Sequence, residues 1–446
     1  MFRSRAGRNP GAKPVTRLNG GAHVAETPEA AASYTGRSRM LWTFADQAVS
    51  SLTNFALAIV VAKSVTKDDF GAFALAALTT FGFVVGLVRA FVGEPFVVRF
   101  SAANQAERRR GTAHAGGAAL SFGALGAVIC LLIAAAVGGR AGPPFAALAL
   151  SLPGLMLQDT WRHMFFAAGR PAAATVNDLV WAVMQFTLLG LLLAGGSDSL
   201  FLITLAWGMS ALAAAFVGYL QTGIAPSPLA TFSWVRETRD ISVQLGLGFT
   251  LNMGAINFVT YAIGGIVGLA AAGAMRAAQT VLGPMNLVFA GFNAFALPML
   301  SRAAVAGDRL LRKALIGGLA LSGVAAVWVA VLVLLPDRIG RAILDDSWEG
   351  ADQLMLPSGL LLVSVALVVG ATNSLVALSR ADLMLRLTSI QAPLMLILGV
   401  FGAWQWGVVA AAYGLLIAQT VGVVTGWVLF IRADADPRRW AVQTEA

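Results

Sequence analysis

Twelve continuous apolar segments, each 20 to 26 residues long, run through this chain of 446 residues. About 20 apolar residues in a helix are enough to cross a bilayer, so every segment is long enough to span one. Because the runs are continuous rather than alternating, they predict helices and not barrel strands. The predicted spans are 41–62, 70–93, 113–137, 144–168, 175–194, 199–221, 241–263, 272–297, 312–335, 353–378, 383–403 and 406–431.

The composition agrees with a membrane setting, since 58% of the residues are hydrophobic and only 12% are charged. A soluble chain of this composition would lack the polar side chains to cover its surface. The spans leave no room for a sizeable soluble domain. We therefore predict an all-α polytopic membrane protein, with a disordered cytoplasmic tail (1–38), two six-helix lobes (39–225 and 226–432) and a short cytoplasmic tail (433–446).

The basic residues outside the spans indicate the orientation of the chain. With the N-terminus inside, 23 Lys and Arg fall on the cytoplasmic side and only 5 on the other. The positive-inside rule then predicts that both termini are cytoplasmic, which requires an even number of spans. The net charge of +9 is mostly this topology signal, and its dispersal over many short loops argues against a nucleic-acid partner.

Residues with catalytic or metal-binding chemistry are few in this chain. The single cysteine, Cys130, lies in an apolar run, and the three histidines have no metal-ligand spacing with carboxylates or thiols. No phosphate-cradling glycine loop is present either. We therefore predict neither an enzyme nor a bound cofactor or metal, and leave open the coupling of the protein to protons or sodium ions.

The two halves of the sequence repeat one another. The second span begins with residues 70–74 and leads into 94–99. About 203 positions later, the eighth span begins with the similar residues 272–276 and leads into 297–302, and both endings contain Pro-x-x-x-Arg. An even number of helices per repeat predicts two parallel repeats, an arrangement that places a substrate cavity between the halves. Chance similarity between apolar helices is the alternative.

Two further matches support the repeat and show where it diverges. Gly169 after the fourth span corresponds to Ser379 after the tenth, and each is followed by an arginine. Asp46 in the first span corresponds to Gln244 in the seventh, so the halves share a scaffold but not a charge pattern. We expect any ion coupling to reside in the first half.

Four stretches, 46–55, 69–71, 89–95 and 275–286, resemble the polysaccharide-exporter branch of the multidrug/oligosaccharidyl-lipid/polysaccharide flippase superfamily. The resemblance covers nearly the whole chain after residue 40. It implies a MATE-like fold with a central cavity and an O-antigen-flippase-like carrier in the bacterial cytoplasmic membrane. Such a carrier moves a polyprenyl-pyrophosphate-linked glycan to the outer leaflet, among membrane lipids and beside the glycosyltransferases and glycan polymerase of the same pathway.

A pyrophosphate substrate requires cations, and three arginines are assigned to the membrane rather than to the span ends: Arg89, Arg162 and Arg276. The planar guanidinium fork suits phosphate oxygens and stays protonated. Arg276 also begins a polar stripe of three- and four-residue spacing along the eighth span, which predicts a cavity wall or, alternatively, polar contacts between packed helices. The stripe continues through Gln279, Asn286 and Asn293.

The acidic residues that we assign to the membrane, Asp46, Asp159 and, at the end of the second span, Glu94, match these arginines in number. They are candidates for charge pairing or for ion coupling. Asp159 lies three residues before Arg162, on the same helix face, which predicts a local pair between them. For Arg89 and Glu94, near the inner end of the second span, snorkelling to the interface is the alternative to a role in the cavity.

Three other functions remain open at this stage. A peptidoglycan-precursor flippase and a drug/cation antiporter belong to the same superfamily, and an antiporter of cations should have a more anionic cavity. A non-transporting membrane scaffold would instead have all its intramembrane charges tightly paired and no central cavity.

Overall fold

The computed structural model describes residues 36–101 and 103–436. The leading tail predicted for 1–38 and the closing tail predicted for 433–446 therefore lie almost wholly outside the described residues. Within them the long helices are α1 (Gly36–Ser64), α5 (Gln105–Val137), α6 (Gly142–Ala167), α7 (Pro171–Ala194), α8 (Leu200–Thr222), α9 (Thr231–Ile266), α10 (Leu269–Leu282), α11 (Met285–Val305), α12 (Leu311–Val333), α14 (Ala351–Ala377), α15 (Ala381–Trp406) and α16 (Val408–Ala435).

The second predicted span is a composite helix of 34 residues, Lys67–Phe100. It contains α2 (Lys67–Phe73), α3 (Phe81–Val88) and α4 (Glu94–Phe100), joined by two π-helical stretches, η1 (Ala74–Thr80) and η2 (Arg89–Gly93). Wide π-turns inside α-helices are rare and often lie at functional sites. In this protein η1 lines an apolar pocket, and η2 begins at Arg89.

Eleven helices among the described residues are long and apolar enough to cross a membrane. The 26-residue α6 packs along α5 and α8 as a further member of the bundle. The protein therefore has about twelve membrane-crossing segments. Three short elements were not predicted: the 3-10 turns η3 (Pro228–Ala230) and η4 (Asp345–Trp348), and α13 (Asp337–Leu344).

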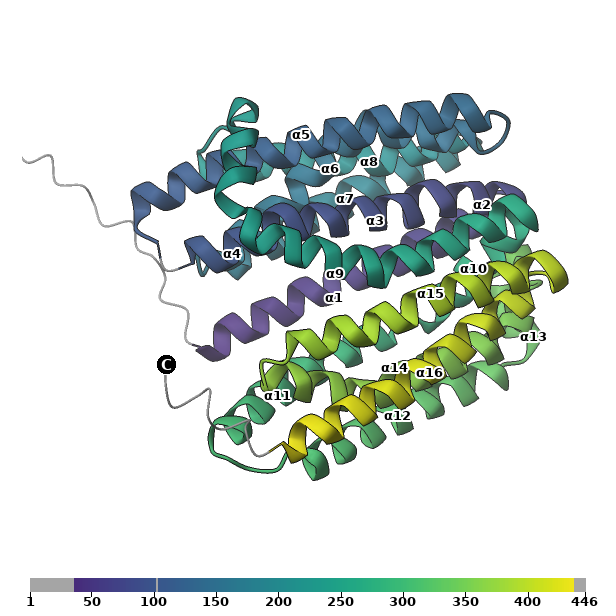
Figure 1. Ribbon diagram of the computed structural model, residues 1–446. Helices are drawn as coiled ribbons and strands as arrows, with labels where there is room; N and C mark the ends of the chain where they lie inside the picture. The colour runs from purple at the N-terminus through teal and green to yellow at the C-terminus, as the bar shows by residue number, and fades with distance from the viewer. Residues whose placement is uncertain (1–35, 102, 437–446) are drawn as a thin grey trace, which may run out of the picture.

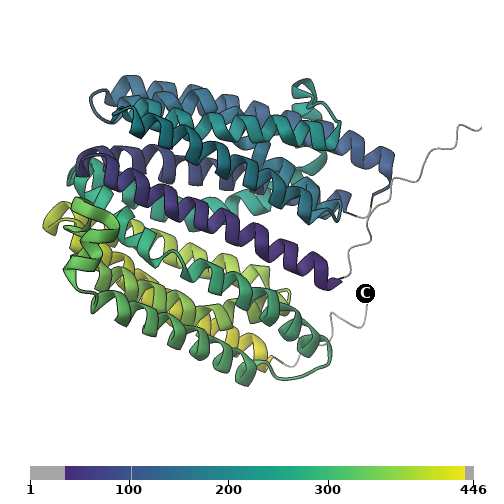
Figure 2. The same cartoon turned by 180° about the vertical axis from the view of Figure 1, so that it is seen from behind.

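The helices form two groups (Figures 1 and 2). Helices α5–α8 lie in one group together with the composite helix, and α12 and α14–α16 lie in the other, with α1 running between them. The N-terminal part of α9 packs on η2 and α5, and α9 also packs along α15. The groups approach one another at the end that carries α2 and α10, and they splay apart toward the end where the chain terminates.

The internal repeat is visible in the local geometry. The helices α2 and α10, which correspond in the repeat, pack through their equivalent glycines: a Cβ built on Gly273 would lie 3.1 Å from the Cα of Gly71. Gly169 and Ser379 also correspond, and both adopt a left-handed backbone, with φ of 69° and 56°. Ser379 has a side chain and still adopts this conformation, so the helix-ending geometry is kept in both repeats.

One predicted span is interrupted. The segment expected at 272–297 is two helices, because Pro284 lacks the N–H that would continue the backbone hydrogen bonds and α10 ends beside it at Leu282. The polar stripe that begins at Arg276 is therefore divided between α10 and α11. Other prolines, such as Pro153, Pro357 and Pro393, lie inside continuous helices.

We predict that Gly71→Ala opens the contact between α2 and α10. A Cβ on Gly71 would lie 1.9 Å from the carbonyl oxygen of Leu269, a backbone atom that cannot rotate away. Overpacking of this kind costs about 1–3 kcal/mol, enough to shift the population toward an open end by roughly 5- to 150-fold. Spin labels at Asp68→Cys and Asp346→Cys, in a Cys130→Ala background, measure the separation by double electron–electron resonance.

The matched control is Gly82→Ala in the same composite helix, where a Cβ would meet nothing within 4 Å. Its distance distribution should equal that of the parent. An unchanged distribution for Gly71→Ala would contradict the closure of this end through the two glycines.

One ion pair also joins the groups at this end, and a neighbouring arginine supports it. The Glu349 carboxylate accepts from Lys67 of α2, and its Oε1 lies 3.2 Å from Nη2 of Arg341 in α13. The hydrogen bond from Lys67 lowers the pKa of Glu349 below its ordinary value of 4.5, and the neighbouring charges of Lys67 and Arg341 act in the same direction. The pair therefore favours closure at neutral pH.

We predict that closure at this end weakens in acid. A carboxyl group with a lowered pKa contributes fully above its ordinary pKa, and the contribution is lost as the pH falls through the lowered value. The distance between the labels at 68 and 346 should lengthen as the pH falls below 4.5. The variant Glu349→Gln should lengthen it at pH 7 and remove the acid transition; a transition that persists in this variant would show that another group causes it.

Candidate functional site

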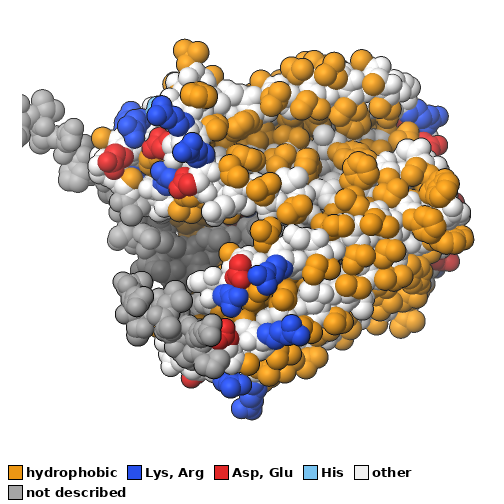
Figure 3. All heavy atoms as spheres, in the orientation of Figure 1, with side chains coloured by type: hydrophobic (Ala, Val, Ile, Leu, Met, Phe, Trp, Pro, Cys, Tyr) orange, Lys and Arg blue, Asp and Glu red, His pale blue; other side chains and the backbone are white. Residues whose placement is uncertain are grey.

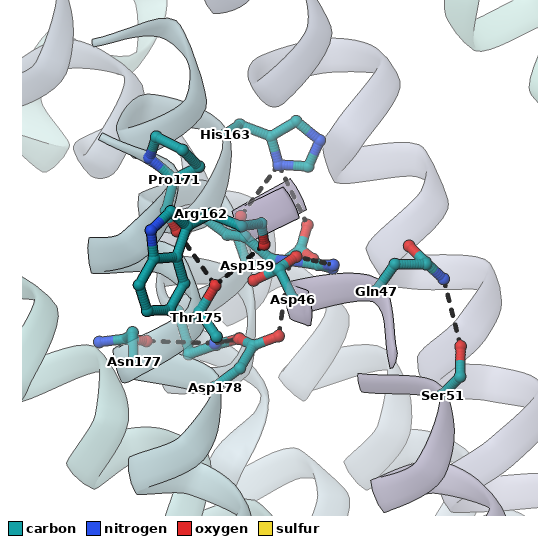
Figure 4. Close-up of polar contacts among 12 residues, drawn as sticks. Asp46, Gln47, Ser51, Asp159, Arg162, His163, Pro171, Thr175, Asn177 and Asp178 are labelled. Carbon is teal, nitrogen blue, oxygen red and sulfur yellow. Dashed lines mark hydrogen bonds and ion pairs between the residues drawn. The ribbon is translucent and has the colours of Figure 1, made fainter. Parts of the chain in front are cut away.

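Charged side chains inside the first group of helices gather in one place, which we call the charged cluster. They come from α1, η2, α6 and α7, and Figure 4 shows most of them pointing toward one another. The cluster consists of Asp46, Arg89, Asp159, Arg162, His163 and Asp178.

Arg89 and Asp159 form a two-pronged ion pair between the composite helix and α6. Nε of Arg89 donates to Oδ1 and Oδ2 of Asp159 at 3.1 and 2.9 Å, and Nη2 donates to Oδ1 at 2.5 Å. The Asp159 side chain is 7% exposed and that of Arg89 is 39% exposed. A paired fork of this kind fixes the orientation of both groups.

Arg162 pairs with two other carboxylates. Its Nε donates to Oδ2 of Asp46 at 2.8 Å, its Nη2 donates to the same oxygen, and Nε lies 3.5 Å from Oδ2 of Asp178. All three side chains are buried or nearly so. The local pair that the sequence predicts between Asp159 and Arg162 does not form among the described ion pairs, because each residue finds a partner on another helix.

Asp178 is a member of the cluster that the sequence analysis missed. Its Oδ1 accepts from Nε2 of Gln158 at 2.8 Å, and the same amide donates to Oδ1 of the neighbouring Asn177 at 3.2 Å. The available signal was an acidic residue inside the span predicted at 175–194. Its place near the start of that span is typical of an interfacial residue, yet packing of α7 against α1 and α6 buries it.

His163 completes the cluster and is placed by a glycine. Its Nδ1 lies 3.7 Å from Oδ2 of Asp159, and 3.0 Å from the backbone oxygen of the same residue. A Cβ on Gly93 would lie 2.8 Å from the imidazole ring, so the ring fits only because that position in η2 has no side chain. Three aspartates thus face two arginines and one histidine.

Glu94 does not belong to the cluster. Its side chain is exposed, and the ion pairs of the described residues do not include it. The predicted set of paired acids therefore needs a correction. Asp46 and Asp159 belong to it, but the third acid is Asp178 and not Glu94. Glu94 begins α4, at the end of η2, and its side chain turns outward from that position.

Arg276 differs from the other two intramembrane arginines. Its Nη1 donates to Oε1 of Gln279 at a long 3.4 Å, and its buried Nε has no hydrogen-bond partner. Within the described part of the chain, no carboxylate oxygen lies within 4.0 Å of its guanidinium. Arg276 is therefore a half-buried cation in the 14-residue helix α10, with unused donors.

The remaining stripe residues lie on α11, beyond the break. Asn286 and Asn293 are exposed, and Oδ1 of Asn293 accepts from Nδ2 of Asn373 in α14 at 2.8 Å. α11 runs beside α1. A Cβ built on Gly291 of α11 would lie 3.7 Å from the ring of Phe44 in α1. For Asn293 the alternative of a polar contact between packed helices is realised.

Comparisons with known proteins identify the fold. No family model matches the chain, and no curated protein matches it in sequence. Solved structures do match. An inward-facing multidrug resistance MATE family transporter of the MOP superfamily superposes with a TM-score of 0.67 at 14% identity, covering 89% of this chain and 96% of that one.

Two further structures have different described functions. The lipid II flippase MurJ, in an inward closed conformation, matches with a TM-score of 0.64 at 12% identity over 89% of this chain and 90% of that one. A MOP superfamily transporter from Pyrococcus furiosus with a binding pocket of reversed polarity matches with a TM-score of 0.54 at 12% identity, over 89% and 94%. The predicted fold class, an all-α MATE-like membrane protein of about twelve spans, is confirmed.

We predict that Asp159→Asn destabilises the protein while Glu94→Gln does not. The first change leaves Arg89 without its counter-charge, at a cost of about 3 kcal/mol, the low end for a buried pair because Arg89 is partly accessible. The second removes an exposed carboxylate. Thermal unfolding in detergent measures both, and the double variant Arg89→Gln/Asp159→Asn should recover much of the loss. Equal stability of the two single variants would contradict the role of the pair.

Proposed function

We propose that this protein is an alternating-access flippase for a polyprenyl-pyrophosphate-linked oligosaccharide in the synthesis of cell-surface polysaccharide. The observation that carries the proposal is the unpaired guanidinium of Arg276. A charge left uncompensated inside a bilayer costs up to roughly 2.5–3.5 kcal/mol on insertion scales, the upper values applying at the bilayer centre. A pyrophosphate group at this position would supply the missing counter-charge and use the free N–H donors.

The fold supports movement between two open states. Its solved relatives include transporters and a lipid flippase, and one of them is described as inward-facing and another as inward closed. In this chain α2 and α10 are in contact at one end while the groups splay at the other (Figure 1). With both termini in the cytoplasm, as the basic residues predict, the splayed end faces the cytoplasm, where a lipid-linked glycan would enter.

The charged cluster has a separate role in this proposal. Arg89 and Arg162, first considered as phosphate contacts, already have carboxylate partners, so we assign them to the framework of the first group. Asp46 and Asp159 act there as charge-pairing residues. The cluster contains one more aspartate than arginines, and we assign to it any proton taken up during transport.

Arg276 also bears on the alternatives. Lipid II, the ligand named for one structural relative, makes a peptidoglycan-precursor flippase the second candidate, because the unpaired arginine suits any pyrophosphate headgroup. An unpaired arginine disfavours cationic substrates and so argues against a drug/cation antiporter. It also argues against a scaffold, for which every intramembrane charge should be paired.

The proposed setting is the bacterial cytoplasmic membrane. Glycosyltransferases that act on the cytoplasmic side would supply the substrate, and a glycan polymerase on the other side would consume it. Loss of the gene product should therefore accumulate lipid-linked oligosaccharide on the cytoplasmic side. Accumulation of peptidoglycan precursor instead would favour the second candidate.

We predict that Arg276→Ala reduces surface glycan by roughly ten- to a hundredfold, because a hydrogen bond to a charged group contributes about 1.5–3 kcal/mol. Arg276→Lys should retain part of the activity, since it keeps the charge but loses the fork. Glycan is measured by surface staining, with the amount of protein in the membrane measured by immunoblot.

The control is Arg309→Ala, an exposed arginine of the loop between α11 and α12, which should leave export unchanged. Normal export by Arg276→Ala at normal abundance would reject the assigned phosphate contact.

A further inference from the structure

A half-open apolar pocket of about 570 Å³ lies apart from both the charged cluster and Arg276. Its walls come from η1 and α3 of the composite helix, from the last turns of α5 and α9, and from Phe145 of α6 and Leu269 of α10. These elements place the pocket in the half of the bundle that carries α2 and α10 (Figure 1). The volume falls within the roughly 300–1,000 Å³ that is typical of small-molecule sites.

The polar groups in the wall are already occupied. Oγ1 of Thr80 lies 2.7 Å from the hydroxyl of Tyr261, and Thr80 also donates to the backbone oxygen of Leu75 at 2.7 Å. Both hydroxyl protons are therefore used when Tyr261 donates to Thr80. No charged residue lines the pocket, and the only thiol, that of Cys130, belongs to a buried residue. A ligand with its own hydrogen-bonding groups would lose those bonds here.

The pocket opens toward the bilayer. Ile129, Val137 and Phe258 line it and are also 49%, 58% and 59% exposed. They belong to helices long and apolar enough to cross the membrane, so their exposed faces contact lipid chains. Figure 3 shows hydrophobic side chains over much of this face of the molecule. The pocket is thus continuous with the lipid-facing surface.

We propose that this pocket binds one acyl chain of a membrane phospholipid. An acyl chain matches the apolar lining, is present at very high local concentration, and enters through the lipid-facing mouth while the headgroup stays at the interface. The lining offers no arginine or lysine for a phosphate, which distinguishes this site from the one assigned to Arg276.

The position of the pocket makes the chain a regulator of conformation. Thr80 belongs to the first repeat and Tyr261 to the second, so an occupant contacts both repeats where they meet. A ligand that binds only the closed arrangement stabilises it in proportion to its occupancy. Phospholipid in this pocket therefore favours the state in which the α2 and α10 end is closed.

Gly265 provides a way to fill the pocket. It lines the wall, and a Cβ at this position would meet nothing within 4 Å, whereas one on Gly264 would lie 2.7 Å from Leu75. Gly265→Leu therefore adds bulk at the pocket wall from a position where the Cβ has open space. Gly323→Leu in α12 is the matched control, because Gly323 also has open space beside it and lies outside the pocket.

The test uses the full-length protein in nanodiscs that contain a phospholipid with a diazirine on one acyl chain. After irradiation, mass spectrometry should map adducts of the parent protein to residues 126–137 and 258–265 in preference to the lipid-facing surfaces of α12 and α16. Gly265→Leu should reduce these adducts at least fivefold, and Gly323→Leu should leave them unchanged.

Three results would overturn the proposal. Adducts spread evenly over all lipid-facing helices would mean that the pocket holds no particular chain. Adducts that persist in Gly265→Leu would place the chain elsewhere. Displacement by equimolar polyprenyl phosphate, but not by unlabelled phospholipid, would assign the pocket to a substrate tail. The readout is lipid contact rather than export. A negative result would therefore leave the proposed function intact, and loss of the proposed function would leave the lipid site intact.

Discussion

The cost of an uncompensated charge inside a bilayer determines the construction of the first group of helices. Arg162 cannot be left alone at this depth, and it is neutralised by Asp46 from α1 and Asp178 from α7. Separating any of these helices would strand a charge, which costs several kcal/mol in a buried site. The cluster therefore makes α1, α6 and α7 one body, and the ion pair of Arg89 attaches the composite helix to it.

The π-helical stretch that begins at Arg89 serves two contacts at once. It presents the guanidinium to Asp159, and because Pro95, four residues after Phe91, has no N–H, the backbone oxygen of Phe91 can accept from other groups. That oxygen accepts from Nε1 of Trp234 at 3.1 Å and from Oγ of Ser242 at 3.2 Å, both on α9. The same segment thus holds the first repeat together and attaches to it the first helix of the second repeat.

The sequence was sufficient to predict most of the spans, because these follow from length and hydrophobicity alone; the span at 272–297 is the exception, divided at Pro284. The sequence could not predict which charges pair. Spacing within one helix is readable, and it favoured Asp159 with Arg162, but the observed pairs join different helices and depend on packing. Asp178 was missed and Glu94 overvalued for a related reason: near a span end, burial is decided by the neighbouring helix rather than by the residue's own segment.

The two halves use a shared scaffold for different electrostatic purposes. In the first, the intramembrane arginines are neutralised by the protein itself; in the second, Gln244 stands where the repeat has Asp46, and Arg276 lacks a carboxylate among the described residues. If the proposed substrate is correct, its phosphate completes the neutralisation only while bound. The charge that costs energy in the empty protein is then the charge that makes binding favourable, and release restores the cost. Unequal halves would thus separate a framework whose arginines are paired within the protein from a site whose electrostatics change when the proposed substrate binds.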